Sequence, residues 1–331
     1  MNGAVLAGGA AFLVSGALAP LLASFAVGRN LLDVPNLRSS HEVPTPRLGG
    51  VAIFFGTLVG VALLIFGKPL GEAWPLLVAA ALMWGVGLAD DLGHLHFGAK
   101  AAAQTLLASG LLLLYPPRII SEAPGALGIA TFFVGVLWIV ALTNAFNFMD
   151  GIDGFTGGVA LVNVLFLAPL AGQAGWFLPA LAGATAGFLV WNISPASIFI
   201  GDSGAYFLGF GLAAVALYAP VPQAEGWTPL GFAACVLVFT PYLFDTAYTL
   251  VRRLRTGAGK NIFLAHREHI YQRITPTTGT HRRTSNLYYG ASVVAGFAAL
   301  LVSEGGAHAL AGAALALACC GSLAGLPKLL R

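Results

Sequence analysis

Long runs of apolar residues, interrupted by short polar segments, extend along the whole chain. About 20 apolar residues are enough for a helix to cross the hydrocarbon core of a bilayer. No linker or soluble segment of domain size separates the runs, so we expect residues 1–331 to form a single domain. The pattern predicts eleven membrane spans, at residues 3–27, 48–67, 74–90, 99–116, 128–147, 155–172, 175–193, 204–220, 228–250, 286–304 and 307–326.

The composition agrees with this pattern. The chain is 58% hydrophobic and only 9% charged, whereas an ordinary soluble domain is about 25% charged. So few charged side chains cannot cover a water-soluble surface. We therefore expect an all-α polytopic membrane protein with about 11 transmembrane helices and a large contact with the lipid bilayer. The net charge of +3 is too small to indicate a nucleic-acid-binding protein.

The distribution of basic residues predicts the orientation. The first charged residue, Arg29, follows the first apolar run, so this run is expected to be a retained helix with its N-terminus outside rather than a cleaved signal peptide. If the spans then alternate, all Lys and Arg residues except Lys68 and Arg118 fall on one side. The positive-inside rule makes that side cytoplasmic, and the C-terminus is expected there too.

Four polar motifs fall on the same predicted side: "ADDLGH", "NFMDGIDG", "FIGDSG" and "AHREHIYQR". A charged group at mid-bilayer costs at least about 2.5–3.5 kcal/mol, so their aspartates are expected to line a hydrated cleft at the interface. Carboxylates gathered there repel one another unless protons or a cation intervene, and oxygen ligands favour a hard cation such as Mg²⁺. Helix capping is the alternative for each aspartate taken alone. The aspartates are Asp90, Asp91, Asp150, Asp153 and Asp202.

A polar residue recurs at every third position where the fifth predicted span ends. These residues are Asn144, Asn147, Asp150 and Asp153, and glycines follow them. Spacing of i, i+3 keeps side chains roughly on one side of a helix, and glycine lets the backbone approach a ligand closely. The pattern predicts a helical stripe that seats a hydrophilic ligand.

Two basic features have two interpretations each. Lys100 is either an anchor at the membrane interface or a partner of the carboxylates. The loop 252–285 carries eight of the sixteen Lys and Arg residues and contains His266, Arg267 and His269. Such a loop either contacts anionic lipid or binds a diphosphate, which Arg can hold through two hydrogen bonds.

Together, these motifs resemble the polyprenyl-phosphate N-acetylhexosamine-1-phosphate transferases, glycosyltransferase family 4. The resemblance extends from about Asp33 to Arg273 and keeps the same order: "ADD", Lys100, "NAFNFMDGIDG", "FIGDSG" and a His-x-x-His stretch. It implies transfer of an N-acetylhexosamine-1-phosphate from a UDP-N-acetylated sugar to undecaprenyl phosphate. UMP would leave, at the cytoplasmic face of a bacterial inner membrane. The loop "HEVPTPRLGG" and the sequence "HREH" are closer to O-antigen-initiating members than to the phospho-N-acetylmuramoyl-pentapeptide transferase, which stays the alternative.

The resemblance also implies roles for individual residues. Asp202 would bind Mg²⁺, with Mn²⁺ as the other candidate cation, and Asn147 would be associated with the metal. Asp90, Asp91 and Lys100 would be catalytic. The sugar, the polymer, the separate roles of Asp90 and Asp91 and the question of a homodimer stay open. The expected substrate-binding residues are Asn144, Asn147, Asp150, Asp153, His266, Arg267 and His269.

Two other functional classes also place polar groups inside a membrane domain. An ion-coupled transporter predicts acidic groups near the midplane of the bilayer and inverted internal repeats, but the chain contains no convincing repeat and its aspartates gather at one interface. An intramembrane aspartyl protease needs two facing aspartates but neither a metal site nor a basic loop. The sequence therefore favours the transferase.

Overall fold

The structure is a computed structural model that describes residues 2–35, 43–66, 74–219, 229–256 and 266–330. Apart from one pair of two-residue antiparallel strands, β1 (Leu32–Asp33) and β2 (Thr45–Pro46), the regular elements described are helical. They are α1 (Asn2–Gly28), α2 (Gly49–Ile65), α3 (Trp74–Gly93), α4 (Phe97–Leu114), α5 (Arg118–Ser121), α6 (Gly125–Phe148), α7 (Phe155–Ala171), the short 3-10 helix η1 (Gly172–Gly175), α8 (Leu178–Asn192), α9 (Gly201–Tyr218), α10 (Pro229–Leu237), α11 (Thr240–Arg255), α12 (Ile270–Thr278), α13 (His281–Glu304) and α14 (Gly306–Leu329).

The predicted class, an all-α polytopic membrane protein, is confirmed. Seven helices among the described residues are long and apolar enough to cross a membrane: α1, α3, α4, α6, α7, α13 and α14. The count becomes eight if α10 and α11 form one broken span, and α2 and α8 are shorter apolar helices. Eleven spans, and an outside N-terminus with a cytoplasmic C-terminus, stay predictions. Lys68, one of the two basic residues predicted on the non-cytoplasmic side, is not among the described residues.

The ninth predicted span, residues 228–250, is not one straight helix. α10 and α11 meet at an angle of 79°, and α11 continues to Arg255 with three arginines in its last turn. Pro241 stands in the first turn of α11. Proline lacks the N–H that a continuous helix needs and favours a helix start, so the chain begins a new helix here.

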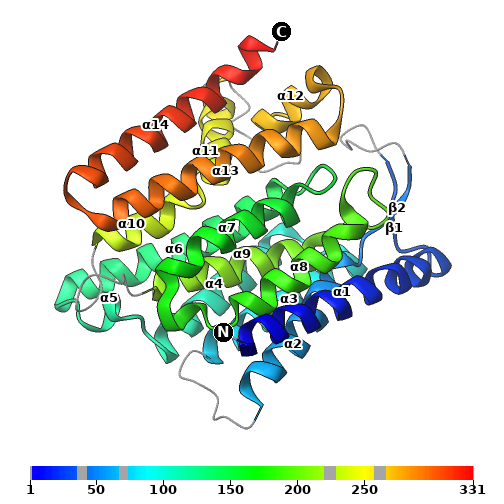
Figure 1. Cartoon of the computed structure of the whole chain (residues 1–331), viewed down its shortest axis with the longest axis horizontal. Helices are drawn as coiled ribbons and strands as arrows, with labels where there is room; N and C mark the ends of the chain where they lie inside the picture. The colour runs from blue at the N-terminus through cyan, green and yellow to red at the C-terminus, as the bar shows by residue number, and fades with distance from the viewer. Residues whose placement is uncertain (1, 36–42, 67–73, 220–228, 257–265, 331) are drawn as a thin grey trace.

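Helix α9 lies at the centre of the bundle. Every residue from Ser203 to Leu217 is buried, as expected for a helix that is apolar on all sides. α3 and α6 pack against α9, α1 packs against α2 and α8, and α13 packs against α7 and α14. Figure 1 shows α12 beside the N-terminal end of α13 and the β1–β2 pair at the same end of the bundle. The N-terminus of α9 thus brings Asp202 among several neighbouring helices.

The predicted stripe from Asn144 to Asp153 is not a continuous helix. α6 ends at Phe148, so the two aspartates lie in the turn that leads to α7. Gly154 has a φ of 72°, in the left-handed region that favours glycine. A Cβ on Gly151 would collide with the Tyr271 hydroxyl. The glycines therefore form a tight turn and admit a neighbouring tyrosine, and glycine's poor helix propensity explains the early end of α6.

Candidate functional site

Four side chains from four helices meet at the N-terminus of α9. Lys100 Nζ, on α4, lies 2.6 Å from Asp90 Oδ2 on α3 and 3.6 Å from Asp202 Oδ2 on α9. Asn147 Nδ2, on α6, donates a 2.7 Å hydrogen bond to Asp202 Oδ1. We call Asp90, Lys100, Asn147 and Asp202 the carboxylate cluster. It contains residues from three motifs of the sequence and the lysine that follows the first of them.

The adjacent aspartates Asp90 and Asp91 point to different partners. Besides Lys100, Asp90 accepts a 2.6 Å hydrogen bond from the backbone N–H of Leu95. The two oxygens of Asp91 accept the backbone N–H groups of Asp202 and Ser203, at 2.8 and 3.0 Å. The first N–H groups of a helix have no partner within it, so Asp91 caps α9 from a neighbouring helix. Asp90 faces the cluster, and Asp91 holds Asp202 in place.

Arg47 also reaches this region, although the sequence indicated it only as a cytoplasmic basic residue. The backbone N–H of Phe199 donates to the Pro46 carbonyl at 2.7 Å, and that of Gly50 donates to the Ile200 carbonyl at 2.7 Å. These bonds hold the "PTPRLGG" segment against "FIGDSG". Arg47 interacts electrostatically with Asp91, and its Nη2 lies 3.3 Å from His94 Nε2. The feature of the sequence that could have indicated Arg47 as a site residue is the Pro- and Gly-rich segment around it.

Asn144 is engaged within the protein. Its Nδ2 donates hydrogen bonds to Gln104 Oε1 on α4 and to the Val140 carbonyl. Gln104 is only 1% exposed. The two amides therefore join α4 to α6. Asn144 thus connects two helices, whereas Asn147, one turn later, belongs to the carboxylate cluster.

The two aspartates of the turn after α6 have opposite electrostatic environments. Burial raises the pKa of Asp150 to about 7, and the negative charges of Asp91 and Asp33 add to the rise. Burial also acts upward on Asp153, but hydrogen bonding to His281 and to the backbone N–H of Ala196 outweighs it and lowers the pKa of Asp153. Asp153 Oδ1 lies 3.3 Å from His281 Nδ1. Asp150 is thus close enough to Asp91 and Asp33 to interact with their charges, whereas Asp153 pairs with His281 at the start of α13.

The basic loop lies against the end of α6. The imidazole rings of His266 and His269 stack with centroids 5.1 Å apart, and the His269 ring centroid lies 6.4 Å from that of Phe148. His269 is buried, His266 is half-buried and Arg267 is exposed. Burial, followed by the electrostatic influence of His269 and of the Arg253 guanidinium, lowers the pKa of His266 to about 4. Of the three predicted diphosphate-binding residues, His269 therefore lies beside the end of α6, and His266 stacks on its ring.

The donor set of the carboxylate cluster suits a hard cation. The carboxylates of Asp90 and Asp202 and the amide oxygen of Asn147 are ligands of the type that Mg²⁺ prefers, and the Asn147 amide N–H holds the Asp202 carboxylate next to it. The Lys100 ammonium lies between the two carboxylates, where positive charge is needed. Among the described residues, no three His, Cys, Asp or Glu side chains form a metal-binding group. The residues present fit the chemistry of Mg²⁺.

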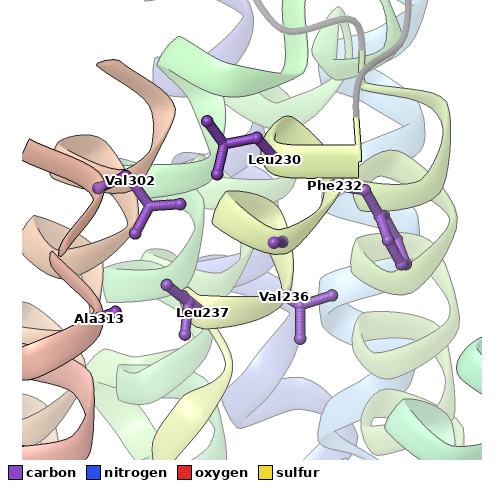
Figure 2. A pocket seen from close by; sticks show the side chains of 8 residues that line it. Leu230, Phe232, Val236, Leu237, Val302 and Ala313 are labelled. Atoms are coloured by element: carbon purple, nitrogen blue, oxygen red, sulfur yellow. The ribbon is translucent and has the colours of Figure 1, made fainter. Parts of the chain in front are cut away.

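An apolar groove of about 510 Å³ lies between α10, α13 and α14 (Figure 2). Aliphatic and aromatic side chains line it, and none of them can transfer a proton or bind an anion. We assign the groove no chemical role. Its lining residues are Leu230, Phe232, Ala233, Val236, Leu237, Val302, Ala309 and Ala313.

Comparison with known proteins identifies the family. Residues 73–219 match the model of glycosyl transferase family 4. An undecaprenyl-phosphate alpha-N-acetylglucosaminyl 1-phosphate transferase of Thermotoga maritima is 32% identical over 79% of this chain and 79% of its own length. This chain belongs to glycosyl transferase family 4. Asp90, Lys100, Asn147 and Asp202, the whole carboxylate cluster, lie within the segment that the family model matches.

Two further relatives of this glycosyl transferase family 4 member are named for two different transferase activities. A probable undecaprenyl-phosphate N-acetylglucosaminyl 1-phosphate transferase of Bacillus subtilis is 28% identical over 82% of this chain and 77% of its own length. A phospho-N-acetylmuramoyl-pentapeptide-transferase of Clostridium kluyveri is 30% identical over 62% of this chain and 71% of its own length. The match to the second kind of transferase covers less of this chain.

Proposed function

We propose that this protein transfers N-acetylglucosamine 1-phosphate, or a closely related N-acetylhexosamine 1-phosphate, from a UDP-sugar to undecaprenyl phosphate. The products are undecaprenyl-diphosphate-sugar and UMP. Family membership and the activities for which the Thermotoga and Bacillus relatives are named support this reaction. Initiation of an O-antigen or another cell-envelope polysaccharide is the role proposed for the product.

The observation that carries the proposal is the carboxylate cluster. Asp90, Lys100, Asn147 and Asp202 come from four different helices and lie within 2.6–3.6 Å of one another in successive pairs. Structural ion pairs alone do not require an amide and two carboxylates to gather at the N-terminus of a buried helix. A helix N-terminus favours bound anions, and Lys100 supplies a further positive charge.

The proposed reaction needs two anions to meet. An oxygen of the lipid phosphate attacks the sugar-proximal phosphorus of the UDP-sugar. The new P–O bond forms as the bond from that phosphorus to the bridging oxygen breaks, and UMP leaves with that oxygen. One diphosphate linkage replaces another. Because the second pKa of a phosphomonoester is about 6, the attacking phosphate is largely ionised at neutral pH and needs no strong base.

Charge neutralisation is therefore the main task of the protein. Lys100 would contact a phosphate oxygen, and Asp90 would hold the Lys100 ammonium in position through its 2.6 Å contact. Asp202, with Asn147, would hold Mg²⁺. When bound, Mg²⁺ neutralises phosphate charge and aligns the reacting groups. Direct attack by the lipid phosphate is favoured over a covalent aspartyl intermediate, because Asp90 is already paired with Lys100.

The turn after α6 and the basic loop would receive the nucleotide end of the donor. Asp150 interacts electrostatically with Asp91, the neighbour of Asp90, and Phe148, two residues before Asp150, contacts both Tyr271 and His269. His269 and His266 would face the diphosphate, with Arg267 reaching it from the exposed side of the loop. Asp153 would fix the geometry of the turn through its bonds to His281 and Ala196.

The proposed location of the cluster, at the cytoplasmic interface, suits the two substrates. The proposed acceptor is held in the bilayer by its polyprenyl tail, whereas the UDP-sugar is water-soluble. A site at the cytoplasmic interface of a bacterial inner membrane can receive both. The excess of Lys and Arg in the loops on the predicted inner side supports this orientation.

The muramoyl-pentapeptide donor is the second candidate, because the Clostridium relative carries that activity in its name. The shorter match and the sequence "HREH" at residues 266–269 favour the N-acetylglucosamine donor. Donor preference is therefore the part of the proposal that the assay must decide.

The test is UMP release by purified protein given undecaprenyl phosphate, Mg²⁺ and a panel of UDP-N-acetylhexosamines that includes UDP-N-acetylmuramoyl-pentapeptide. We expect release that depends on the lipid and is fastest with UDP-N-acetylglucosamine. Asp202→Ala should abolish it, and Glu122→Ala, which removes an exposed carboxylate, is the matched control. No release from any donor by folded protein would refute the transferase reaction.

A further inference from the structure

Asp245, on α11, is a buried carboxylate outside the predicted site. It is 0% exposed, yet five donors surround it. Oδ1 contacts His269 Nδ1 at 3.1 Å, the backbone N–H of Ile270 at 2.8 Å and the Thr249 hydroxyl at 3.2 Å. Oδ2 accepts from the backbone N–H of Tyr271 at 3.1 Å and from the Tyr288 hydroxyl. A buried charge is retained only where its hydrogen bonds are satisfied.

These contacts set where α12 begins. Ile270 and Tyr271 are the first two residues of the helix, and their N–H groups have no partner within it. Asp245 accepts both, so it caps α12 from α11. His269, the residue before the helix, is held at the same time: its backbone N–H donates to Gln272 Oε1 at 3.3 Å.

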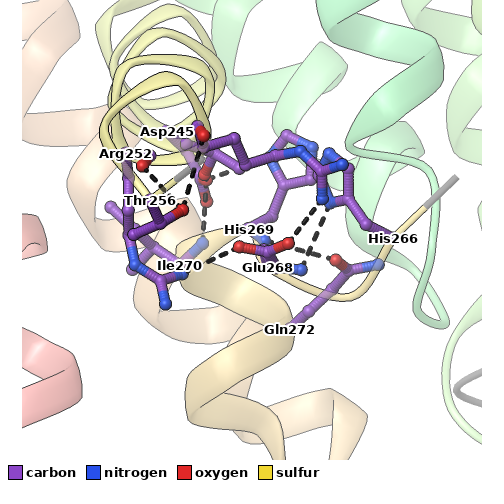
Figure 3. A network of polar contacts seen from close by, with 10 residues as sticks. Asp245, Arg252, Thr256, His266, Glu268, His269, Ile270 and Gln272 are labelled. Atoms are coloured by element: carbon purple, nitrogen blue, oxygen red, sulfur yellow. Dashed lines mark hydrogen bonds and ion pairs between the residues drawn. The ribbon is translucent and has the colours of Figure 1, made fainter. Parts of the chain in front are cut away.

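A second layer anchors the loop from outside (Figure 3). Glu268 forms ion pairs with Arg252, at 3.2 Å, and with Arg253 in the last turn of α11. The backbone N–H of Glu268 donates to His266 Nδ1 at 3.3 Å. Residues 266–271 are therefore fastened to α11 at two points, one fully buried and one half-exposed.

The contact to Asp245 also fixes the orientation of the His269 ring. A carboxylate that accepts several N–H and O–H groups acts as an acceptor, so the ring nitrogen facing it, Nδ1, must carry a proton. The oxygens of a diphosphate only accept hydrogen bonds, so Nε2 must carry a proton as well when it meets that group, and both nitrogens of the imidazolium are then donors. Among the contacts of the described residues, none engages Nε2. A buried carboxylate on Nδ1 orients a functional imidazole and stabilises its protonated form in other enzymes as well.

We propose that Asp245 is a positioning residue for the diphosphate end of the site: it holds His269 by its Nδ1–H and directs the Nε2–H edge of the ring to the diphosphate of the UDP-sugar. This inference rests on the proposed function. It assigns Asp245 no contact with substrate. It makes the buried acid on α11 a determinant of donor binding rather than of the transfer step.

The kinetic test measures KM for UDP-N-acetylglucosamine in UMP release. Asp245→Asn and His269→Gln should each raise KM about 10–100-fold, with a smaller change in kcat. The double variant should bind no worse than His269→Gln alone, because the two residues act as one unit. Tyr288→Phe is the matched control: it removes a donor to Oδ2 and leaves the contact between Oδ1 and His269, so it should lower stability without raising KM. Unchanged KM in folded Asp245→Asn, or fully additive losses in the double variant, would overturn the inference.

A spectroscopic test uses the wild-type protein and does not depend on folding of a variant. In ¹⁵N-histidine-labelled protein, the His269 signals, identified by their loss in His269→Gln, should show a protonated Nδ1. A neutral ring protonated at Nε2 would overturn the inference while leaving the transferase reaction intact. Absence of UMP release by wild-type protein from any donor would overturn both.

Discussion

The side-chain amide of Asn147 donates a 2.7 Å hydrogen bond to the carboxylate of Asp202, joining the end of α6 to the start of α9. The two residues are separated by 55 positions in the chain. One turn earlier on α6, the side-chain amide of Asn144 donates a hydrogen bond to Gln104 on α4. Two asparagines three residues apart on α6 therefore contact different helices, α4 and α9.

This difference gives the first prediction. Asn147→Ala should lower the rate of UMP release about 10–100-fold and leave the unfolding temperature close to that of wild type. Asn144→Ala should instead destabilise the protein by about 1–3 kcal/mol, because it leaves the buried Gln104 amide without its partner. Thermal unfolding in detergent and UMP release, measured on both variants, separate the two effects. Equal loss of folded protein in both variants would contradict the assignment.

The second prediction concerns the adjacent aspartates. Asp91→Asn should lower the free energy of unfolding by about 0.5–2 kcal/mol, because it weakens the cap on two N–H groups of α9. Asp90→Asn removes the charge that holds Lys100 and should reduce kcat with little change in unfolding temperature. Thermal unfolding and kcat measured for both variants are the check. If Asp90→Asn is the less stable variant and Asp91→Asn the less active one, the assignments are reversed.

The third prediction concerns the cation. Chelation by EDTA should stop UMP release, and added Mg²⁺ should restore it, with Mn²⁺ as the second cation to try. Lys100→Met should lower kcat about 100-fold or more, because the reacting phosphates lose a preorganised positive charge. UMP release measured against added Mg²⁺, for wild type and for Lys100→Met, distinguishes the contribution of the cation from that of the lysine. Full activity in EDTA would rule out the metal site.

The fourth prediction concerns pH. The pKa of His266 is lowered from 6.5 to about 4 in the folded protein, so between these values the unfolded chain binds a proton that the folded chain does not. Stability therefore falls as pH falls through this window. The ring is half-buried, and solvent screening keeps the effect small. The drop in unfolding temperature from pH 7 to pH 5 should be smaller in His266→Gln than in wild type. An equal or larger drop in the variant would contradict the lowered pKa.

Some features of this protein were determined by the sequence alone. Apolar runs of membrane length predict a helical membrane protein, because such runs are stable in lipid only as helices or closed barrels. The motifs around Asp90, Asn147 and Asp202, with Lys100, indicated the family that the comparisons then established. Both conclusions depend on local properties: hydrophobicity averaged over a window, and residue types at short spacing.

Other features were decided only by the tertiary structure. Periodicity predicts a stripe from Asn144 to Asp153, but the chain ends α6 at Phe148, where Gly151 must admit Tyr271 from α12. Adjacent positions do not reveal that Asp91 caps α9 while Asp90 faces Lys100. Asp245 has no motif around it that signals a role, since its five donors come together only when α11, α12 and α13 pack. Contacts between distant segments depend on how helices pack, and the order of polar and apolar residues along one helix does not encode its neighbours.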